Sequence, residues 1–254
     1  MMAGKAATDN KRWRCMSVCK EFEKLNVFPD FATHGNIVRV TVGQGERKCD
    51  FSVHKGLVCA ASPYFNAALN NTNFKEGREG AVHLEEDDVE VFKSFLCWLY
   101  TRDITPHADE EGHVLGLIKL FVFADARGVR ALKIALIDAL FDAIAQKWTL
   151  PVNFIPYVYE NTPDNSGLRK LMVDMVLRTQ DSLMTYCSKL ETGEFFRDYA
   201  VAQEDFEKIR PRTPRVLCRL MWCMIDRCAY HEHKEELAVY HSDTKVLAFL
   251  GRIY

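Results

Sequence analysis

The chain has 254 residues, of which 48% are hydrophobic and 27% are charged, and its formal net charge at pH 7 is -2. A chain of this length can bury a sizeable core in one large domain or two small ones, and its composition excludes a chain that is disordered as a whole. The small net charge lacks the basic excess typical of nucleic-acid-binding domains, so we expect no nucleic-acid partner.

The distribution of apolar residues and cysteines bears on the cellular compartment. No apolar run approaches the roughly 18 to 20 residues that span a bilayer, and the first residues lack the order of a secretory signal. We therefore expect no membrane partner and an intracellular location, in the cytoplasm or the nucleus. The 9 cysteines, an odd number, then indicate reduced thiols buried as small hydrophobes rather than a disulfide framework.

Alternating apolar and polar residues predict two antiparallel strands near the amino end, residues 37–42 and residues 48–54. A third short strand is predicted over residues 81–84. The alternating apolar positions of the first two strands are Val38, Val40, Val42, Cys49, Phe51 and Val53.

Helices are expected to cover this ribbon, because two strands alone are only marginally stable. A short helix is predicted over residues 55–61. Ser62 followed by Pro63 is typical of an N-cap and a first helical position, which predicts a second helix over residues 63–69. Residues 70–80 are polar and contain glycine, which indicates a loop.

Three longer helices follow in the first half. Asp87 or Asp88 is predicted to cap the first, which ends near Thr101. The second covers residues 114–126 and the third residues 129–145. Since the third is apolar nearly all round, we expect it to be deeply packed and central to its domain.

The pattern changes after residue 146, where prolines punctuate the chain and strands give way to helices. A helix beginning at Thr162-Pro163-Asp164 is predicted to bury one apolar stripe while Arg169, Lys170 and Asp174 face water. Its apolar stripe is Leu168, Leu171, Met172, Met175 and Val176.

Two further helical segments are predicted nearer the carboxyl end. Residues 184–203 are predicted to be helical with an interruption near Gly193, and a second apolar stripe follows Pro214. That stripe is Leu217, Leu220, Met221, Met224, Ile225 and Cys228.

The most specific motif is the run from Phe51 to Phe65, in which F-x-V-H-K is followed by S-P-Y-F. This run resembles the signature of a BTB/POZ domain, and Phe74-Lys75-Glu76-Gly77 arrives where that family closes its second helix. The resemblance covers about residues 37–145, and residues 92–101 and 157–176 are similar to filamentous-fungal BTB-domain proteins. The signature residues are Phe51, His54, Lys55, Ser62, Tyr64 and Phe65.

The resemblance implies an α+β fold, namely a BTB/POZ fold in which a small β-sheet is flanked by a cluster of α-helices, followed by an all-helical carboxyl-terminal extension. We accordingly divide the chain into three parts. These are residues 1–29, an amino-terminal helical or flexible extension; residues 30–147, the BTB/POZ domain; and residues 148–254, the helical carboxyl-terminal region.

The implied function is a non-enzymatic protein–protein interaction module that mediates homo- or hetero-dimerisation and scaffolding, with proteins as partners. Members often form homodimers through an amino-terminal helix, and residues 15–25 carry an apolar face suited either to that seam or to packing on their own domain. Lys55 matches a basic residue that many dimeric members pair with an aspartate, whose place is held here by Asn36 or Ile37. The candidate dimer face is Cys15, Val18, Cys19, Phe22 and Leu25.

The alternative function that the resemblance implies is a substrate adaptor for a cullin-type ubiquitin ligase. In such adaptors an apolar-x-Glu element before the third strand contacts the cullin scaffold, and Phe74 and Glu76 have this form. The other interpretation is that Phe74 packs beneath its loop while Glu76 is solvated.

An alternative of another class is an enzyme or metalloprotein with an unrecognised site. The standard motifs for nucleotide, acyl-transfer and metalloprotease chemistry are missing, and we expect no cofactor. His54 is expected to hydrogen-bond at the turn between strand and helix rather than to act in catalysis. The acidic stretch from Glu85 to Asp88 is interpreted as a solvated helix cap rather than a cation site.

One group of residues has the composition of a metal site. Residues five apart on a helix are turned by about 140°, so a helical arrangement would keep its cysteines from converging on one ion. We therefore expect no metal site and a buried, inert role. The group is Cys218, Cys223, Cys228, His231 and His233.

Overall fold

The computed structural model of the chain describes residues 35–104, 112–148, 151–178, 193–209, 222–223 and 225–233. In that part of the chain a small sheet with interspersed helices comes first, and only helices follow. The predicted α+β fold with a helical carboxyl-terminal part is therefore confirmed. None of the helices described is both long and apolar enough to cross a membrane.

Three strands form one mixed sheet in the order β2-β1-β3. Val40 lies at its centre, with Phe51 opposite it on the antiparallel side and Val82 opposite it on the parallel side. The predicted alternation of the first strand is confirmed, because Val38, Val40 and Val42 are all buried. The strands are β1 (Ile37–Val42), β2 (Cys49–His54) and β3 (Ala81–Leu84).

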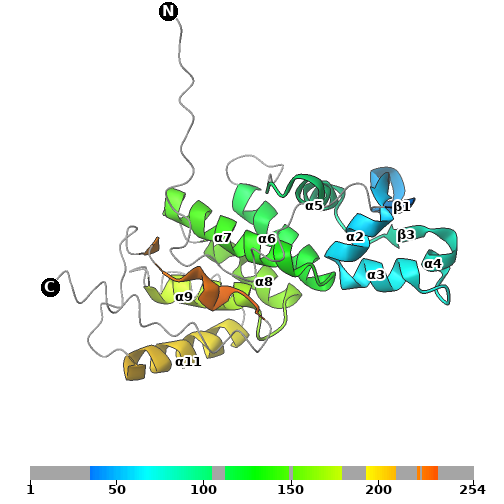
Figure 1. Cartoon of the computed structure of the whole chain (residues 1–254). Coiled ribbons are helices and arrows are strands. Elements are labelled where there is room, and N and C mark those ends of the chain that lie inside the picture. The colour runs from blue at the N-terminus through cyan, green and yellow to red at the C-terminus, as the bar shows by residue number, and fades with distance from the viewer. Residues whose placement is uncertain are drawn as a thin grey trace, which may run out of the picture.

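Helices pack around this sheet (Figure 1). The predicted loop over residues 70–80 is wrong in part, because residues 75–79 form a short helix that ends at Gly80 in the left-handed conformation, with φ of 64°. The helices of this half are α2 (Lys55–Ala61), α3 (Pro63–Asn70), α4 (Lys75–Glu79), α5 (Val89–Thr101), α6 (Gly112–Ala126) and α7 (Arg130–Lys147), with a short 3-10 turn, η2 (Gly45–Arg47), between β1 and β2.

Two side chains cap helices where the sequence predicts them. The Ser62 hydroxyl accepts a hydrogen bond from the Phe65 backbone N–H at 3.3 Å and caps α3. Of the two candidate aspartates ahead of α5, Asp88 is the cap, since its carboxylate accepts from the Glu90 N–H at 2.8 Å. Each cap satisfies a backbone donor that the helix itself leaves without a partner.

The core of this half is continuous from the sheet to α7. Aromatic rings of α3, α5 and α6 stack on one another: Phe95 lies 6.2 Å from Phe65 and 5.1 Å from Phe123 between ring centroids. The prediction that the last helix is deeply packed is confirmed, because its large apolar side chains are at most 2% exposed. These are Leu132, Ile134, Leu136, Ile137, Leu140, Phe141 and Ile144.

In the described part of the second half, α8 packs on α6, η5 packs on α7, and α11 packs on α9 on the side away from α7 (Figure 1). The predicted stripe from Leu168 to Val176 is buried. The helix carrying it begins at Gly167 rather than at Thr162, and a Cβ atom at Gly167 would lie 1.9 Å from the Tyr230 carbonyl oxygen. The elements are η3 (Val152–Phe154), α8 (Ile155–Asn161), α9 (Gly167–Arg178), α11 (Gly193–Ile209) and η5 (Arg227–Tyr230).

Parts of two predicted helices lie outside the described residues. Of residues 184–203, only those from Gly193 onward are described, and they belong to α11. Of the stripe after Pro214, only Ile225 and Cys228 are described, and Cys228 lies in the 3-10 turn η5 rather than in an α-helix.

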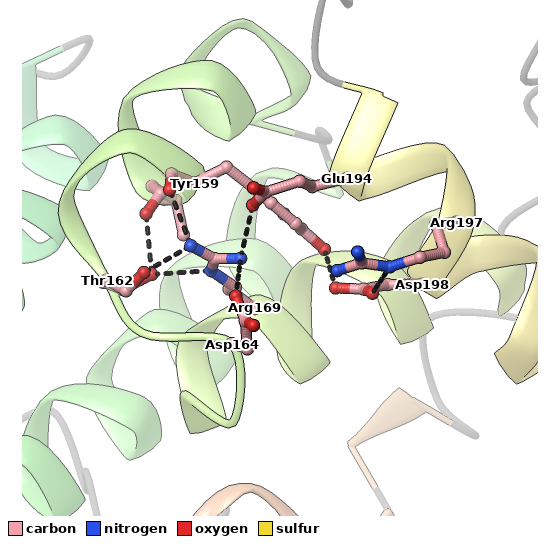
Figure 2. A network of polar contacts seen from close by, with 8 residues as sticks. Tyr159, Thr162, Asp164, Arg169, Glu194, Arg197 and Asp198 are labelled. Carbon is pink, nitrogen blue, oxygen red and sulfur yellow. Dashed lines mark hydrogen bonds and ion pairs between the residues drawn. The ribbon is translucent and has the colours of Figure 1, made fainter.

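The prediction that Arg169 faces water is wrong: its side chain is 5% exposed and joins α8, α9 and α11 (Figure 2). The guanidinium donates to the carbonyl oxygens of Tyr159, at 2.7 Å, and of Thr162, and to the Thr162 hydroxyl at 3.2 Å. It also pairs with the carboxylates of Asp164 at 3.0 Å and Glu194 at 2.8 Å. The carbonyls at the end of α8 thus obtain partners within the protein.

A second contact in Figure 2 extends this network along α11. The Tyr159 hydroxyl donates to the Asp198 carboxylate at 3.0 Å, and Arg197 lies 3.5 Å from the same carboxylate. Burial, followed by the charge and the hydrogen bond of Asp198, raises the pKa of Tyr159 above its ordinary value of 10.0. Asp174, also predicted to face water, instead accepts from the Tyr230 hydroxyl at 2.6 Å.

Candidate protein interface

The signature residues Phe51 and Phe65 belong to the core rather than to a surface. Phe65 is fully buried, and its ring stacks on Phe95. Phe51 is half-buried on β2, with its ring centroid 5.0 Å from that of Phe92 on α5. These two aromatic positions explain why the signature specifies the fold: they attach the sheet and α3 to the same helix.

His54 lies at the N-cap position of α2, where β2 ends. Its Nδ1 atom lies 2.9 Å from the Tyr100 hydroxyl oxygen, and its backbone N–H donates to the same oxygen at 3.2 Å. The prediction that His54 hydrogen-bonds at the turn between strand and helix agrees with this geometry. The contact fixes the end of β2 to the last turn of α5.

Lys55 makes a contact within its own chain. Its ammonium group donates to the Leu69 carbonyl oxygen at 2.9 Å, near the end of α3, where carbonyl groups lack helical partners. The two residues expected at the aspartate's place, Asn36 and Ile37, lie beside it. The Asn36 carbonyl accepts from the Lys55 backbone N–H at 2.8 Å, while Ile37 pairs with His54 across the strands and is 63% exposed.

Ser62 and Tyr64 connect α3 to the end of α6. The Ser62 hydroxyl donates to the Arg127 carbonyl oxygen at 2.6 Å, in addition to capping α3. The Arg127 guanidinium lies over the Tyr64 ring, 5.0 Å from its centroid, and also pairs with Asp87. Tyr64 is 39% exposed, so it is the signature residue that offers a large side chain to solvent.

Two residues of the acidic stretch from Glu85 to Asp88 have different roles. Asp88 caps α5 as predicted, but Asp87 is not solvated, because its side chain is 18% exposed and bonded to Arg127. Burial raises the pKa of Asp87 above its ordinary value of 3.8, although the charge of Arg127 acts in the opposite direction. This part of the prediction is therefore wrong: Asp87 ties the loop before α5 to the end of α6.

Phe74 and Glu76 lie at the start of α4. Phe74 is 50% exposed, so it does not pack beneath its loop, and Glu76 is half-buried. Among the described residues the Glu76 carboxylate has no cation within ion-pairing distance. Gly77 is required by packing, since a Cβ atom there would lie 2.3 Å from the Asn71 carbonyl oxygen. The turn that this glycine allows places Phe74 on the surface.

The solvent-facing side of α3 leads directly to Phe74, and the two form what we call the α3–α4 face. Every residue of this face is exposed, none is charged, and an aromatic side chain lies at each end. The Asn70 side-chain amide donates to the Asn66 side-chain oxygen at 2.7 Å in its middle. The residues of the face are Tyr64, Asn66, Ala67, Asn70 and Phe74.

Two other predicted sites are the candidate dimer face and the cysteine and histidine group. The candidate dimer face, residues 15–25, lies outside the described residues. Of the cysteine and histidine group, Cys218 also lies outside them. Three other members of the group do converge: the ligand atoms of Cys228, His231 and His233 lie within 4.8 Å of one another. The expectation concerned residues five apart on a helix, whereas Cys228 lies in the 3-10 turn η5 and both histidines follow that turn.

Residues 30–127 match the family model described as "BTB/POZ domain". The chain is also 36% identical over 75 residues to "Kelch-like protein 40" of Homo sapiens. That alignment covers 30% of this chain and 11% of the human protein, so the chain spans only a small part of its relative's length.

The matched segment contains the sheet, α2 to α6 and the α3–α4 face. BTB domains generally dimerise and bind proteins, and they are typically non-catalytic. The likeness of residues 92–101 and 157–176 to fungal members stays a prediction. Residues 30–127 of this chain are thus a BTB/POZ domain, a known protein–protein interaction module.

Proposed function

We propose that the chain acts as a non-enzymatic protein-interaction module, in which residues 30–147 form the BTB/POZ unit and residues 148–254 a helical extension. The observation that carries this proposal is the α3–α4 face. Interface centres are depleted of charged residues and enriched in aromatic ones, and this face has both properties. It lies at the opposite end of the described structure from α11 (Figure 1).

The first partner that we propose is a second copy of the chain. Dimerisation is general among BTB domains, and the apolar stripe of residues 15–25 needs a surface on which to bury itself. The charged pair that many dimeric members form is not part of this proposal. Lys55 binds the Leu69 carbonyl, and the neighbouring strand position is the apolar Ile37.

Light scattering at micromolar concentration tests homodimerisation. We expect the wild-type chain to show twice the mass of one chain and Phe22→Asp to show the mass of one, because a carboxylate in an apolar seam loses its hydration. Lys24→Asp, a charge change outside the stripe, is the matched control and should remain dimeric. A wild-type monomer at all concentrations would contradict the proposal and assign residues 15–25 to their own domain.

The second candidate is adaptor function on a cullin-type scaffold, which a specific observation favours. Phe74 is half exposed, and the Glu76 carboxylate follows two residues later without an ion-pair partner among the described residues. An exposed phenylalanine can fill an apolar pocket of a partner, and the carboxylate can accept hydrogen bonds at its rim. The uncharged surface of α3 extends the contact beyond these two side chains.

A pulldown with a purified cullin scaffold tests this candidate. We expect Phe74→Ala to weaken recovery by at least about tenfold, because a buried aromatic anchor contributes about 2 kcal/mol or more to binding. Val201→Ala is the matched control, since Val201 is 55% exposed and belongs to α11, which lies away from α3 (Figure 1). Unchanged recovery for Phe74→Ala, or no recovery of the wild-type chain, would rule out cullin binding through this face.

The enzyme alternative depends on a pocket that could bind a substrate. The space between α7 and η5 is bordered by Phe121, Lys133, Tyr230 and Glu232, among others, and leaves no room even for a water molecule. Ligand sites usually measure roughly 300 to 1,000 Å³. This space therefore does not bind a substrate.

A further inference from the structure

The segment that ends the described chain contains three side chains with metal-binding atoms, Cys228, His231 and His233. One ligand atom of each lies within 4.8 Å of those of the other two. Thiolate sulfur and imidazole nitrogen are the ligands that zinc prefers, and three protein ligands with a fourth position for water are a known zinc arrangement. We propose that these three residues bind one Zn²⁺ ion.

The local backbone explains how three residues so close in sequence converge. η5 turns tightly after Asp226, whose carboxylate accepts from the Cys228 N–H at 3.0 Å. The His231 N–H donates to the Cys228 carbonyl at 3.2 Å, and the His233 N–H donates to the His231 carbonyl at 3.1 Å. These bonds fold the segment back on itself, so that the thiol and both imidazoles meet on one side.

Contacts with two helices hold the segment in this conformation. Arg227 donates to the Asp142 carboxylate at 2.6 Å and to the Asp138 carbonyl at 3.1 Å, both on α7. On the other side, the Tyr230 hydroxyl donates to Asp174 on α9, and the Glu232 carboxylate accepts from the first N–H of α9 at 2.9 Å. Ligands positioned in this way bind an ion without a large cost of ordering the chain.

The surroundings also suit a bound cation. The Asp138 carboxylate lies 3.4 Å from His231 Nε2, and a carboxylate beside a ligating histidine typically orients the ring and raises its basicity. Cys228 and His231 are 3% and 8% exposed, whereas His233 is partly exposed, so the ion would be buried on one side and reachable on the other. Carboxylates outnumber cationic groups among the charged side chains of the segment and of the parts of α6 and α7 that pack near it. They are Asp125, Asp138, Asp142, Asp226 and Glu232, against Arg130, Lys133 and Arg227.

A zinc ion at this position would act structurally. It would join the two ends of the turn, on which Arg227 and Glu232 attach the chain to α7 and α9. The described residues give three ligands, which leaves the fourth position of the tetrahedron open to water or to a ligand from outside these residues. The segment would then be more firmly docked with zinc than without it.

Metal analysis of the purified full-length chain tests the proposal. After treatment with a chelator and dialysis against zinc, we expect about one zinc ion per wild-type chain and a marked loss in Cys228→Ser and His233→Gln. With cobalt in place of zinc, the wild type should show the visible absorption of tetrahedral cobalt and a thiolate charge-transfer band in the ultraviolet. Cys228→Ser should lose that band.

Matched variants separate this site from other thiols and imidazoles. Cys223 lies in the same stretch of the chain but outside the cluster, and His83 is exposed on β3. The variants Cys223→Ser and His83→Gln should therefore bind zinc as the wild type does. His233→Gln is the decisive variant, because His233 is only half-buried and its loss should leave the fold intact by circular dichroism. A folded wild type that retains no zinc, or full zinc binding in both Cys228→Ser and His233→Gln, would overturn the proposal.

Discussion

Residues 37–147 and the described part of residues 151–233 share one apolar core, but buried cations play a larger part in the second region. In the first region the sheet and helices pack through aliphatic and aromatic side chains, to which α7 contributes on nearly every face. In the second region Arg169 joins the end of α8 to α9 and α11, and Arg227 joins η5 to the middle of α7. An apolar core gains from area removed from water, whereas a buried cation requires a full set of partners.

This difference predicts how each region responds to mutation. A truncated apolar side chain leaves a cavity, and its cost rises with the cavity that the neighbours cannot fill. A truncated arginine leaves several polar groups without partners at once, and those groups lie in different elements. The second region should therefore depend more strongly on a few residues than the first.

The largest effect is expected for Arg169→Ala. Two carbonyl oxygens at the end of α8 would lose their buried donors, and the ring of Tyr159 would lose the guanidinium that lies 4.4 Å from its centroid. We expect a loss of about 3 to 5 kcal/mol in the free energy of unfolding, measured by urea denaturation of the full chain. Lys170→Ala is the control: it changes the exposed neighbour and should cost less than about 0.5 kcal/mol.

Variants of the two carboxylates that pair with Arg169 separate the contribution of its ion pairs from that of its contacts with buried carbonyl groups. Asp164 is 81% exposed and Glu194 is 53% exposed, so water can replace the arginine around either of them. Asp164→Asn and Glu194→Gln should each cost less than about 1 kcal/mol. If either cost as much as Arg169→Ala, the ion pairs rather than the buried carbonyl contacts would stabilise the junction.

For the first region we expect Leu140→Ala to cost about 2 to 5 kcal/mol, as measured by the same denaturation. Leu140 is fully buried on α7, so the removed methyl groups leave a cavity among side chains of several helices. Val201→Ala, an apolar truncation at an exposed position, is the control and should lie within about 0.5 kcal/mol of the wild type. An equal loss in both variants would mean that burial does not decide the cost.

The same difference explains which elements the sequence predicts well. Val38, Val40 and Val42 alternate, and α7 is apolar nearly all round, so the apolar pattern alone predicts their burial. The signature residues also reveal the fold, because Phe65 packs against Phe95 in the core and Ser62 caps α3.

The periodic pattern of apolar residues does not predict which polar side chains are buried. A helix pattern places Arg169 on the wet side of α9, and only the loop after α8 and the start of α11 give it partners. For the same reason the sequence does not predict that Cys228, His231 and His233 converge, because a tight 3-10 turn decides their positions. The exposure of Phe74 likewise depends on the turn that Gly77 permits, which the pattern assigned to a loop.

A small effect at neutral pH, and the largest dependence on pH, is expected for Tyr159→Phe. Loss of the hydroxyl removes one hydrogen bond to Asp198 and should cost about 1 kcal/mol near pH 7, since that carboxylate is partly exposed and can be hydrated. The folded chain holds the pKa of Tyr159 above its ordinary value of 10.0, chiefly through burial. Above that pH the unfolded chain releases this proton while the folded chain retains it, so wild-type stability falls as pH rises.

Urea denaturation of both proteins between neutral pH and pH values above 10.0 measures this difference. The wild type should lose up to about 1.4 kcal/mol more per pH unit than Tyr159→Phe in the alkaline range, so that its advantage at pH 7 shrinks and then reverses. The other titrating groups are common to both proteins and cancel in the comparison. Parallel curves would mean that the phenol titrates alike in the folded and unfolded chains, and that the junction of α8 with α11 is open to water rather than buried.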